Sequence, residues 1–376
     1  MENAPPRGMY CLAPLNGWNN QQLTKNCGII PYLFHKLYGF HAVMVGTKLG
    51  GYPDLDTYVK GLQMDFLPDA SVETEISYIQ SHVKDMDVLV LHSAYDFYFP
   101  IVQCYRALRP DGKIYLELDT NIYWADRTEW DRAAFLEFLQ CCDVVGASCR
   151  RMQKYIGQKW PCVVEYIPNG FYNFSQMDLS VDFTQKENII LTVGRIGTKQ
   201  KNNELLLEAF AEVAMDIPDW RIRLVGPVEN TFFEYLRSYG LQHPDVIHRV
   251  ECVGPIQDKK RLMSEYQRAK IFALTSRLEG GTPNVVAEAL YGGCYMLTSE
   301  IDASEDITDQ GHCGASFPID GKEDLARILR RICTSEDCLQ KGEQHAARYG
   351  RATFDFLKIV PRLYYLLFQE APAWGK

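Results

Sequence analysis

The amino-acid sequence predicts an α/β protein built from two doubly wound, Rossmann-like domains. Its 376 residues exceed what one hydrophobic core usually serves, so two domains of ordinary size are expected. With 47% hydrophobic, 12% aromatic and 23% charged residues, the chain has the composition of a folded, soluble protein. Short apolar runs alternate with amphipathic helical stretches in two cycles, which is the pattern of parallel-sheet α/β domains.

Each cycle supplies its own set of buried strands, short and rich in β-branched residues. In the first cycle we expect strands at 9–15, 40–46, 86–94, 112–119 and 143–148, a helix over 129–141, and a closing run at 163–170. In the second cycle we expect strands at 188–195, 221–226, 246–254, 270–276 and 294–299, and helices over 203–214, 259–269 and 283–291.

The domain boundaries follow from these cycles. Residues 1–170 form the predicted N-terminal domain, the polar stretch 171–187 a linker, and 188–350 the C-terminal domain. The remaining segment, 351–376, contains a helix over 353–369 that is apolar around much of its circumference. Such a helix needs a broad packing surface, and Pro361 is expected to kink it.

Charge and composition narrow the classes of partner. The formal net charge of −9 argues against a nucleic-acid-binding protein. Neither a signal peptide nor an apolar run long enough to span a bilayer is recognised. The predicted first domain holds 15 basic and 19 acidic residues, so we expect a cytoplasmic protein with at most weak peripheral contact at the inner membrane face.

The cysteine pattern indicates reduced thiols. Twelve cysteines are scattered through the chain without an export signal. Cys333 and Cys338 have the spacing of metal ligands but no second pair or histidine nearby, so no zinc site is expected.

A glycine loop before a helix marks the first candidate site. Gly280 and Gly281 precede Thr282, a good helix cap, and Pro283, which is favoured at the first helical position. Free backbone N–H groups at such a helix tip suit a phosphate. The alternative is an ordinary tight turn after a strand.

Two carboxylates flank this loop. Glu279 lies just before it, and Glu288 lies six residues past the expected cap, roughly 9 Å along the helix axis. Both could accept hydrogen bonds from hydroxyl groups of an extended ligand whose phosphates lie between them, as in a nucleotide sugar. Alternatively, Glu288 is a solvated helix residue, although its apolar neighbours favour partial burial.

Two cations are expected to face the same crevice. Arg195 follows the first strand of the second domain and Lys201 precedes the next helix, so both belong at the carboxyl edge of the sheet, where doubly wound folds bind ligands. There they could stabilise charge that develops on a diphosphate. The neighbouring Lys199 is interpreted as an exposed, solvated charge.

The segments VGRIGTKQKNNELLLEAF, TSRLEGGTPNVVAEAL and YIPNG together resemble the retaining glycosyltransferases of family four, and the resemblance covers most of the chain. It implies the GT-B fold, in which two Rossmann-like domains face a central cleft and a C-terminal helix crosses back to the first domain. It also implies that Arg195 and Lys201 hold the donor diphosphate, that Glu288 holds ribose hydroxyls, and that Glu279 lies by the donor sugar. Backbone groups of Gly280, Gly281, Thr282, Pro283 and Asn284 would touch sugar and phosphate.

The sequence departs from the family pattern at two places. Eight residues separate Glu279 from Glu288, where the family usually has seven, which puts the role of Glu279 in question. The double glycine that often follows the family's first strand is absent from NGWNNQQLTKNCG, where Gly17 or Gly28 would serve instead.

The first domain offers further candidates at the ends of its strands. His92 ends an apolar run where the family commonly places a histidine that approaches the donor sugar, and the alternative is a capping or packing role. Asp119, Asn121, Tyr123 and Trp124 end another strand and could line the acceptor side, since aromatic rings pack on sugar C–H groups, or they could be ordinary loop residues.

The sequence thus predicts a retaining hexosyltransferase that moves a sugar from a UDP-sugar to a hydroxyl acceptor, a glycan or a lipid-linked glycan among them, in polysaccharide or glycoconjugate assembly. No metal and no other cofactor is expected, because Arg195 and Lys201 would replace a divalent ion. Two alternatives remain: a nucleotide-sugar epimerase of the same fold, and a non-catalytic nucleotide-sugar-binding subunit. A nicotinamide oxidoreductase is disfavoured because neither domain opens with G-x-G-x-x-G.

Overall fold

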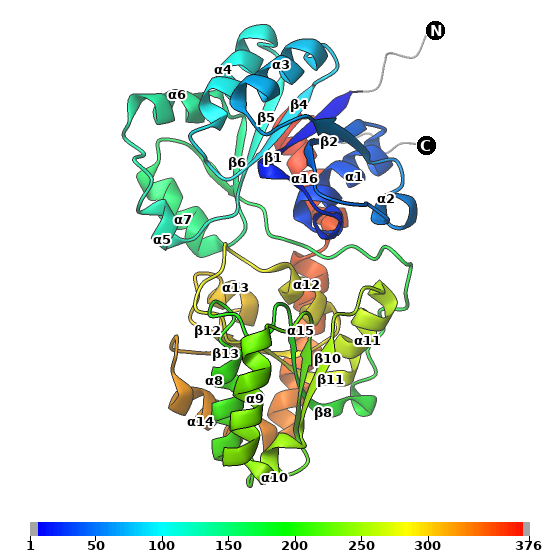
Figure 1. Ribbon diagram of the computed structural model, residues 1–376, viewed down its shortest axis with the longest axis vertical. Coiled ribbons are helices and arrows are strands. Elements are labelled where there is room, and N and C mark those ends of the chain that lie inside the picture. The colour runs from blue at the N-terminus through cyan, green and yellow to red at the C-terminus, as the bar shows by residue number, and fades with distance from the viewer. Residues whose placement is uncertain (1–6, 371–376) are drawn as a thin grey trace. The chain divides into compact units, whose positions relative to one another are not determined.

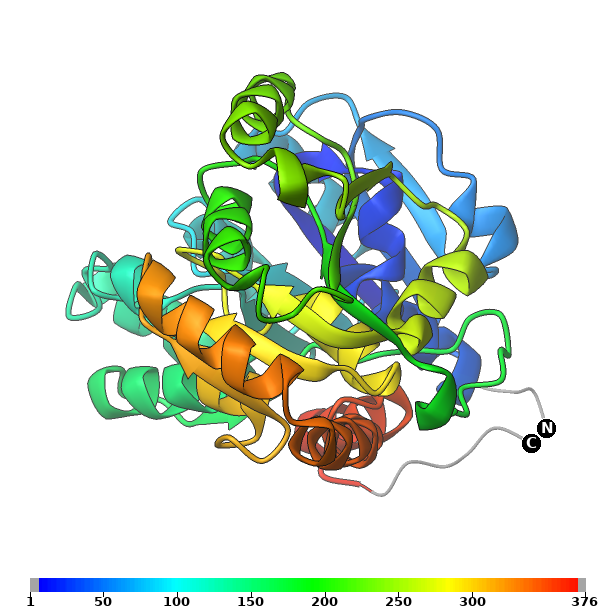
Figure 2. The ribbon, with the colours of Figure 1, turned by 90° about the horizontal axis from the view of Figure 1, so that it is seen from below.

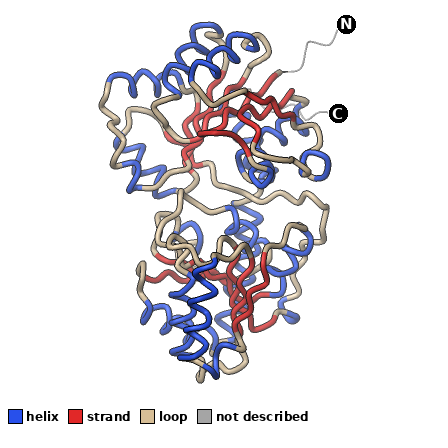
Figure 3. The backbone as a smooth tube through the Cα atoms, in the orientation of Figure 1, coloured by secondary structure: helices blue, strands red, loops and turns tan. Residues whose placement is uncertain are grey.

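A computed structural model describes residues 7–370 and divides the chain into two compact units (Figure 1). One unit takes the chain up to Tyr172 and again from Phe356, and the other spans Asn173–Asp355. The chain first leaves one unit for the other between Tyr172 and Asn173, within the predicted linker 171–187. In each unit, helices enclose a central set of strands (Figure 3).

The first unit is a parallel sheet of seven strands in the order β3-β2-β1-β4-β5-β6-β7. Its strands are β1 (Gly8–Trp18), β2 (His41–Lys48), β3 (Gln63–Leu67), β4 (Val88–His92), β5 (Lys113–Leu118), β6 (Val144–Ala147) and β7 (Val164–Tyr166). Its helices are α1 (Asn26–Tyr38), α2 (Asp54–Thr57), α3 (Val72–His82), α4 (Tyr98–Leu108), α5 (Ile122–Ala125), α6 (Ala133–Cys141), α7 (Arg150–Lys159) and α16 (Phe356–Phe368), with a 3₁₀ turn at Asn20–Thr24.

The second unit is a parallel sheet of six strands in the order β10-β9-β8-β11-β12-β13. Its strands are β8 (Glu187–Val193), β9 (Arg221–Val225), β10 (Val250–Gly254), β11 (Ala269–Leu274), β12 (Tyr295–Ser299) and β13 (Gly314–Phe317). Its helices are α8 (Asn203–Val213), α9 (Asn230–Gln242), α10 (Pro244–Ile247), α11 (Lys259–Arg268), α12 (Asn284–Tyr291), α13 (Ser304–Thr308), α14 (Lys322–Cys333) and α15 (Glu336–Thr353), with a 3₁₀ turn at Phe183–Gln185.

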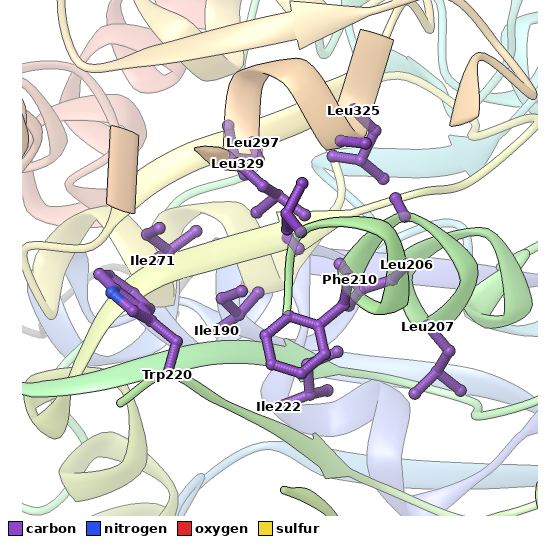
Figure 4. Packing of buried hydrophobic residues seen from close by; sticks show 14 of the residues in the cluster. Ile190, Leu206, Leu207, Phe210, Trp220, Ile222, Ile271, Leu297, Leu325 and Leu329 are labelled. Carbon is purple, nitrogen blue, oxygen red and sulfur yellow. The ribbon is translucent and has the colours of Figure 1, made fainter. Parts of the chain in front are cut away.

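Both faces of the second sheet are covered. Strand residues such as Ile190 and Ile271 meet Phe210 of α8 and Leu329 of α14 in one buried cluster (Figure 4). The green helix α8 and the orange helix α14 lie on this face (Figure 2). Phe272 alternates with its neighbours along β11 and packs instead on Tyr266 of α11, with ring centroids 5.9 Å apart. The alternation is that of a parallel strand buried on both sides.

Helix α16 belongs to the first unit, as predicted for a C-terminal helix that crosses back to the N-terminal domain. Its Tyr364 ring lies 4.5 Å from that of Tyr38 and 6.0 Å from that of Phe34, both on α1. The helix continues through Pro361. The prediction of one helix from residue 353 is wrong at its start, because α15 ends at Thr353 and α16 begins only at Phe356.

The start of one helix and the presence of two edge strands also differ from what the sequence predicted. The helix expected over 129–141 begins at Ala133. Strands β3 and β13 were not expected; both lie at an edge of their sheet, and β3 is half-exposed, so its residues lack the apolar run of a central strand.

None of the helices within residues 7–370 is long and apolar enough to cross a membrane.

Candidate functional site

The predicted donor-binding residues of the second unit converge at the carboxyl ends of β8 and β11. Arg195 lies two residues after β8, and Glu279 lies five residues after β11, which pairs with β8 in parallel. Lys201, in the turn before α8, forms an ion pair with Glu279. Exposed fractions of 16% and 9% for these two side chains place the pair mostly out of water, where the attraction between opposite charges is stronger than at an open surface.

Gln200 connects Arg195 to the ion pair of Lys201 and Glu279. Its Oε1 accepts a hydrogen bond from Nη2 of Arg195 at 2.6 Å. Its Nε2 donates to the Leu278 carbonyl oxygen at 2.8 Å and lies 3.4 Å from Oε2 of Glu279. Arg195 and Lys201 are therefore linked through one amide and one carboxylate, so a single network holds both predicted phosphate ligands.

A second set of hydrogen bonds connects the loops that carry Lys201 and Glu279. Arg277 donates from Nε to Asp320 at 2.8 Å and from Nη1 to the Lys199 carbonyl oxygen at 2.8 Å. Asn202, in the left-handed conformation at φ 50°, donates to the same Asp320 carboxylate at 2.9 Å. These bonds tie the Lys201 turn to the segment that follows β11.

The glycine loop leads into α12, but its helix start differs from the prediction. Pro283 is extended, with ψ 143°, and is itself the residue before the first helical one, Asn284. Thr282 is therefore not the cap, and it is completely buried. The helix expected over 283–291 therefore starts one residue later than predicted. Gly281 has φ +81°, a value that favours glycine.

Glu288 accepts a hydrogen bond from a residue that the sequence analysis did not single out. The completely buried Tyr266 of α11 donates from its hydroxyl to Oε2 of Glu288 at 2.7 Å. Burial, and after it the Glu288 carboxylate, raises the pKa of Tyr266 well above its usual range, so the phenol keeps its proton. Glu288 itself is half-buried, as its apolar neighbours indicated.

His92 of the first unit belongs to a buried polar group at the ends of β4 and β5. Its Nδ1 lies 3.0 Å from Oε2 of Glu117, and the two side chains are 7% and 5% exposed. Asn26, the first residue of α1, donates to the other Glu117 oxygen. Trp18 packs edge-on against the imidazole at 5.2 Å. His92 is thus enclosed by its own unit, and its Nε2 has no partner there among the described residues.

The two candidate glycines have packing reasons of their own. A Cβ atom on Gly17 would lie 2.2 Å from the carbonyl oxygen of Thr47 on β2. A Cβ atom on Gly28 would lie 2.3 Å from the Leu23 carbonyl oxygen, and Gly28 is buried within α1. Close backbone approach therefore accounts for both.

The segment after β5 divides into buried and exposed residues. Asn121 is buried and accepts a hydrogen bond from the Trp124 backbone N–H at 3.1 Å, which caps α5. Asp119 is exposed, as are the rings of Tyr123 (49%) and Trp124 (56%), which pack edge to face. The guanidinium of Arg127 lies over the Tyr123 ring, 3.4 Å from its centroid.

No group of three or more His, Cys, Asp or Glu side chains within residues 7–370 is arranged to hold a metal ion. The residues that sequence reasoning missed are Gln200, Tyr266, Glu117 and Asn26. Gln200 stands next to a recognised lysine, so its place in the motif was a usable signal. The other three act through contacts with residues far along the chain.

A family model and several curated proteins are similar to part of this chain. The family model described as Glycosyl transferases group 1 matches residues 187–335, most of the second unit. Over 157 residues the chain is 27% identical to the GalNAc-alpha-(1->4)-GalNAc-alpha-(1->3)-diNAcBac-PP-undecaprenol alpha-1,4-N-acetyl-D-galactosaminyltransferase of Campylobacter jejuni, covering 41% of this chain and 40% of that one. Over 179 residues it is 25% identical to the phosphatidyl-myo-inositol mannosyltransferase of Mycolicibacterium smegmatis, covering 47% and 44%. The chain thus spans less than half the length of these curated relatives.

Solved structures extend the likeness of the fold to nearly the whole chain. Sucrose-phosphate synthase from Thermosynechococcus elongatus is similar with a TM-score of 0.72 at 16% identity, covering 96% of this chain and 98% of that one. Anabaena HepE, solved in complex with UDP, is similar with a TM-score of 0.75 at 15% identity, covering 97% and 100%. The predicted GT-B fold is confirmed by this likeness and by the two parallel sheets.

Proposed function

We propose that this chain, a GT-B protein of the family-four glycosyltransferase type, transfers a hexosyl group from a UDP-sugar to a hydroxyl acceptor with retention at the anomeric carbon. The observation that carries the proposal is the network of Arg195, Gln200, Lys201 and Glu279 beside the glycine loop and the start of α12. It brings two cations and a helix N-terminus to one place, which suits a diphosphate.

In the proposed reaction, negative charge develops on the leaving diphosphate, next to Arg195 and Lys201. The bond between the anomeric carbon and the β-phosphate oxygen breaks, and its electron pair stays on the departing phosphate. The acceptor oxygen bonds to the same face of the sugar, and its proton passes to a phosphate oxygen. Lys201 and Arg195 would stabilise the negative charge that grows on the leaving group.

Binding of a diphosphate would require Lys201 to exchange partners. Lys201 is paired with Glu279, so a diphosphate would compete with that carboxylate for the ammonium group. Glu279, released toward the sugar, would then accept a hydrogen bond from a sugar hydroxyl. The eight residues between Glu279 and Glu288 still allow this ion pair to form.

The acceptor is proposed to lie on the first unit. The exposed Tyr123 and Trp124 rings would pack on an acceptor sugar, and Asp119 would accept hydrogen bonds from its hydroxyls. That one curated relative is named for transfer onto an undecaprenol-linked glycan supports a glycan or lipid-linked glycan as the acceptor class.

One experiment tests the assignment against its alternatives. Purified protein is incubated with UDP-glucose, UDP-galactose and their N-acetyl forms, with and without extracts of glycan acceptors, and released UDP and the products are analysed. Acceptor-dependent UDP release with an α-linked product supports the proposal. Interconversion of donor sugars without acceptor would indicate an epimerase, and binding without turnover a non-catalytic subunit.

A further inference from the structure

One contact of the candidate site joins a buried phenol to a half-buried carboxylate. Tyr266 is completely buried on α11, and its hydroxyl donates a hydrogen bond to Oε2 of Glu288 on α12, at 2.7 Å. A phenol has one proton to donate. Here that proton is committed to Glu288, the carboxylate that would bind the ribose of the proposed UDP-sugar donor.

The backbone holds Tyr266 in place from the opposite side. Its carbonyl oxygen accepts hydrogen bonds from Nζ of Lys186 at 3.3 Å and from Sγ of Cys294 at 3.1 Å. A Cβ atom on Gly292 would lie 2.5 Å from Cβ of Tyr266, so α11 and the end of α12 are in close contact there. The phenol therefore has little freedom to follow a moving glutamate.

A glutamate on a helix is otherwise a flexible side chain. Its carboxylate loses rotamer freedom when it binds a ligand, and this loss weakens binding unless the side chain is already fixed. One oxygen of Glu288, Oε2, is already fixed by the Tyr266 hydroxyl. A carboxylate held in this way is prepared for a pair of neighbouring hydroxyl groups.

We propose that Tyr266 is a positioning residue that fixes Glu288 for recognition of the vicinal ribose hydroxyls, and so makes the site select ribonucleotides over nucleotides that lack them. The inference rests on the proposed function, since it takes Glu288 as the ribose ligand. It adds the residue on which that selectivity depends.

The test compares two nucleotides on matched variants of the full chain. UDP and 2′,3′-dideoxy-UDP are titrated by calorimetry into the wild-type protein, Tyr266→Phe and Glu288→Gln. Tyr239→Phe is the control, because Tyr239 is also buried in this unit and its hydroxyl bonds to the Leu207 carbonyl oxygen at 2.9 Å, away from the candidate residues.

We expect Tyr266→Phe to weaken UDP about fivefold to tenfold, the effect of one hydrogen bond, and to leave dideoxy-UDP nearly unchanged. The preference for UDP over dideoxy-UDP should fall by the same factor. Glu288→Gln should lower it as well, and Tyr239→Phe should leave it unaltered. Melting temperatures of all four proteins, measured together, separate positioning from loss of structure.

The remaining outcomes contradict the inference in distinguishable ways. If Tyr266→Phe weakens both nucleotides equally, or melts far below Tyr239→Phe, its role is structural and the inference is wrong. If Glu288→Gln loses the preference and Tyr266→Phe keeps it, Glu288 binds ribose without help from Tyr266. If the wild-type protein binds no UDP, the proposed function fails together with the inference.

Discussion

At the scale of single residues, the two cations at the end of β8 and before α8 carry the proposed chemistry. Arg195→Ala and Lys201→Ala should each lower turnover on the order of 100-fold, since each removes a donor directed at developing charge. Lys199→Ala is the matched control on the same loop, because its side chain is exposed, and it should retain activity. Steady-state rates of UDP release measure the effect. A Lys201→Ala rate within twofold of wild type would show that the lysine has no such role.

The same two cations lead to a prediction about metal ions. If Arg195 and Lys201 stabilise the leaving diphosphate, turnover should be unchanged after dialysis against EDTA and after addition of Mg²⁺ or Mn²⁺. Activity that disappears in the chelator and returns with either ion would contradict the assignment.

Glu75 of α3 gives the first unit a pH-dependent stability. Burial raises the pKa of Glu75 to about 7. A raised pKa in the folded state means that the stabilisation is complete below about pH 4.5, the unfolded value, and is lost as pH rises through about 7. Glu75→Gln cannot ionise and should melt at a higher temperature than wild type at pH 8, but at a similar temperature at pH 4.5. Calorimetric scans at both pH values measure this, and an unchanged difference between them would refute it.

At the scale of elements, α16 ties the end of the chain to α1 of the first unit. Tyr364, 8% exposed, packs on Tyr38 and Phe34, whereas Tyr365, 50% exposed, faces water on the same helix. Tyr364→Ala should therefore cost about 3 kcal/mol of unfolding free energy, as truncation of a buried aromatic ring does, and Tyr365→Ala should cost little. Urea unfolding followed by tryptophan fluorescence compares them. Equal destabilisation by both would mean that α16 does not rely on this face.

Central and edge strands differ in how readily the sequence predicts them. Central strands such as β4 and β11 are buried along their whole length and, apart from His92 and Lys270, apolar, so their positions followed from the sequence. The edge strands β3 and β13 interrupt their apolar residues with polar or small ones, and they form because a neighbouring strand offers its hydrogen-bonding edge. Edge strands of this kind depend on their partner and carry little signal of their own.

At the scale of the whole molecule, net charge sets how the chain meets charged surfaces. At −9 the protein should remain in the supernatant when it is centrifuged with phosphatidylglycerol-containing vesicles at physiological salt. Neutral phosphatidylcholine vesicles are the control. Sedimentation with the anionic vesicles that salt does not reverse would contradict the expectation of weak peripheral contact.

The sequence by itself determined the two α/β cycles, the central strands and the motif residues around Arg195, Lys201, Glu279 and Glu288. These depend on periodicity and spacing over a few residues, which a linear chain records directly. Only the tertiary structure decided which side chains complete the site. Tyr266 meets Glu288 across 22 positions, Gln200 meets Glu279 across 79, and Asn26 meets Glu117 across 91. Such contacts arise when the fold brings distant helices, strand ends and loops together, and no local pattern encodes them.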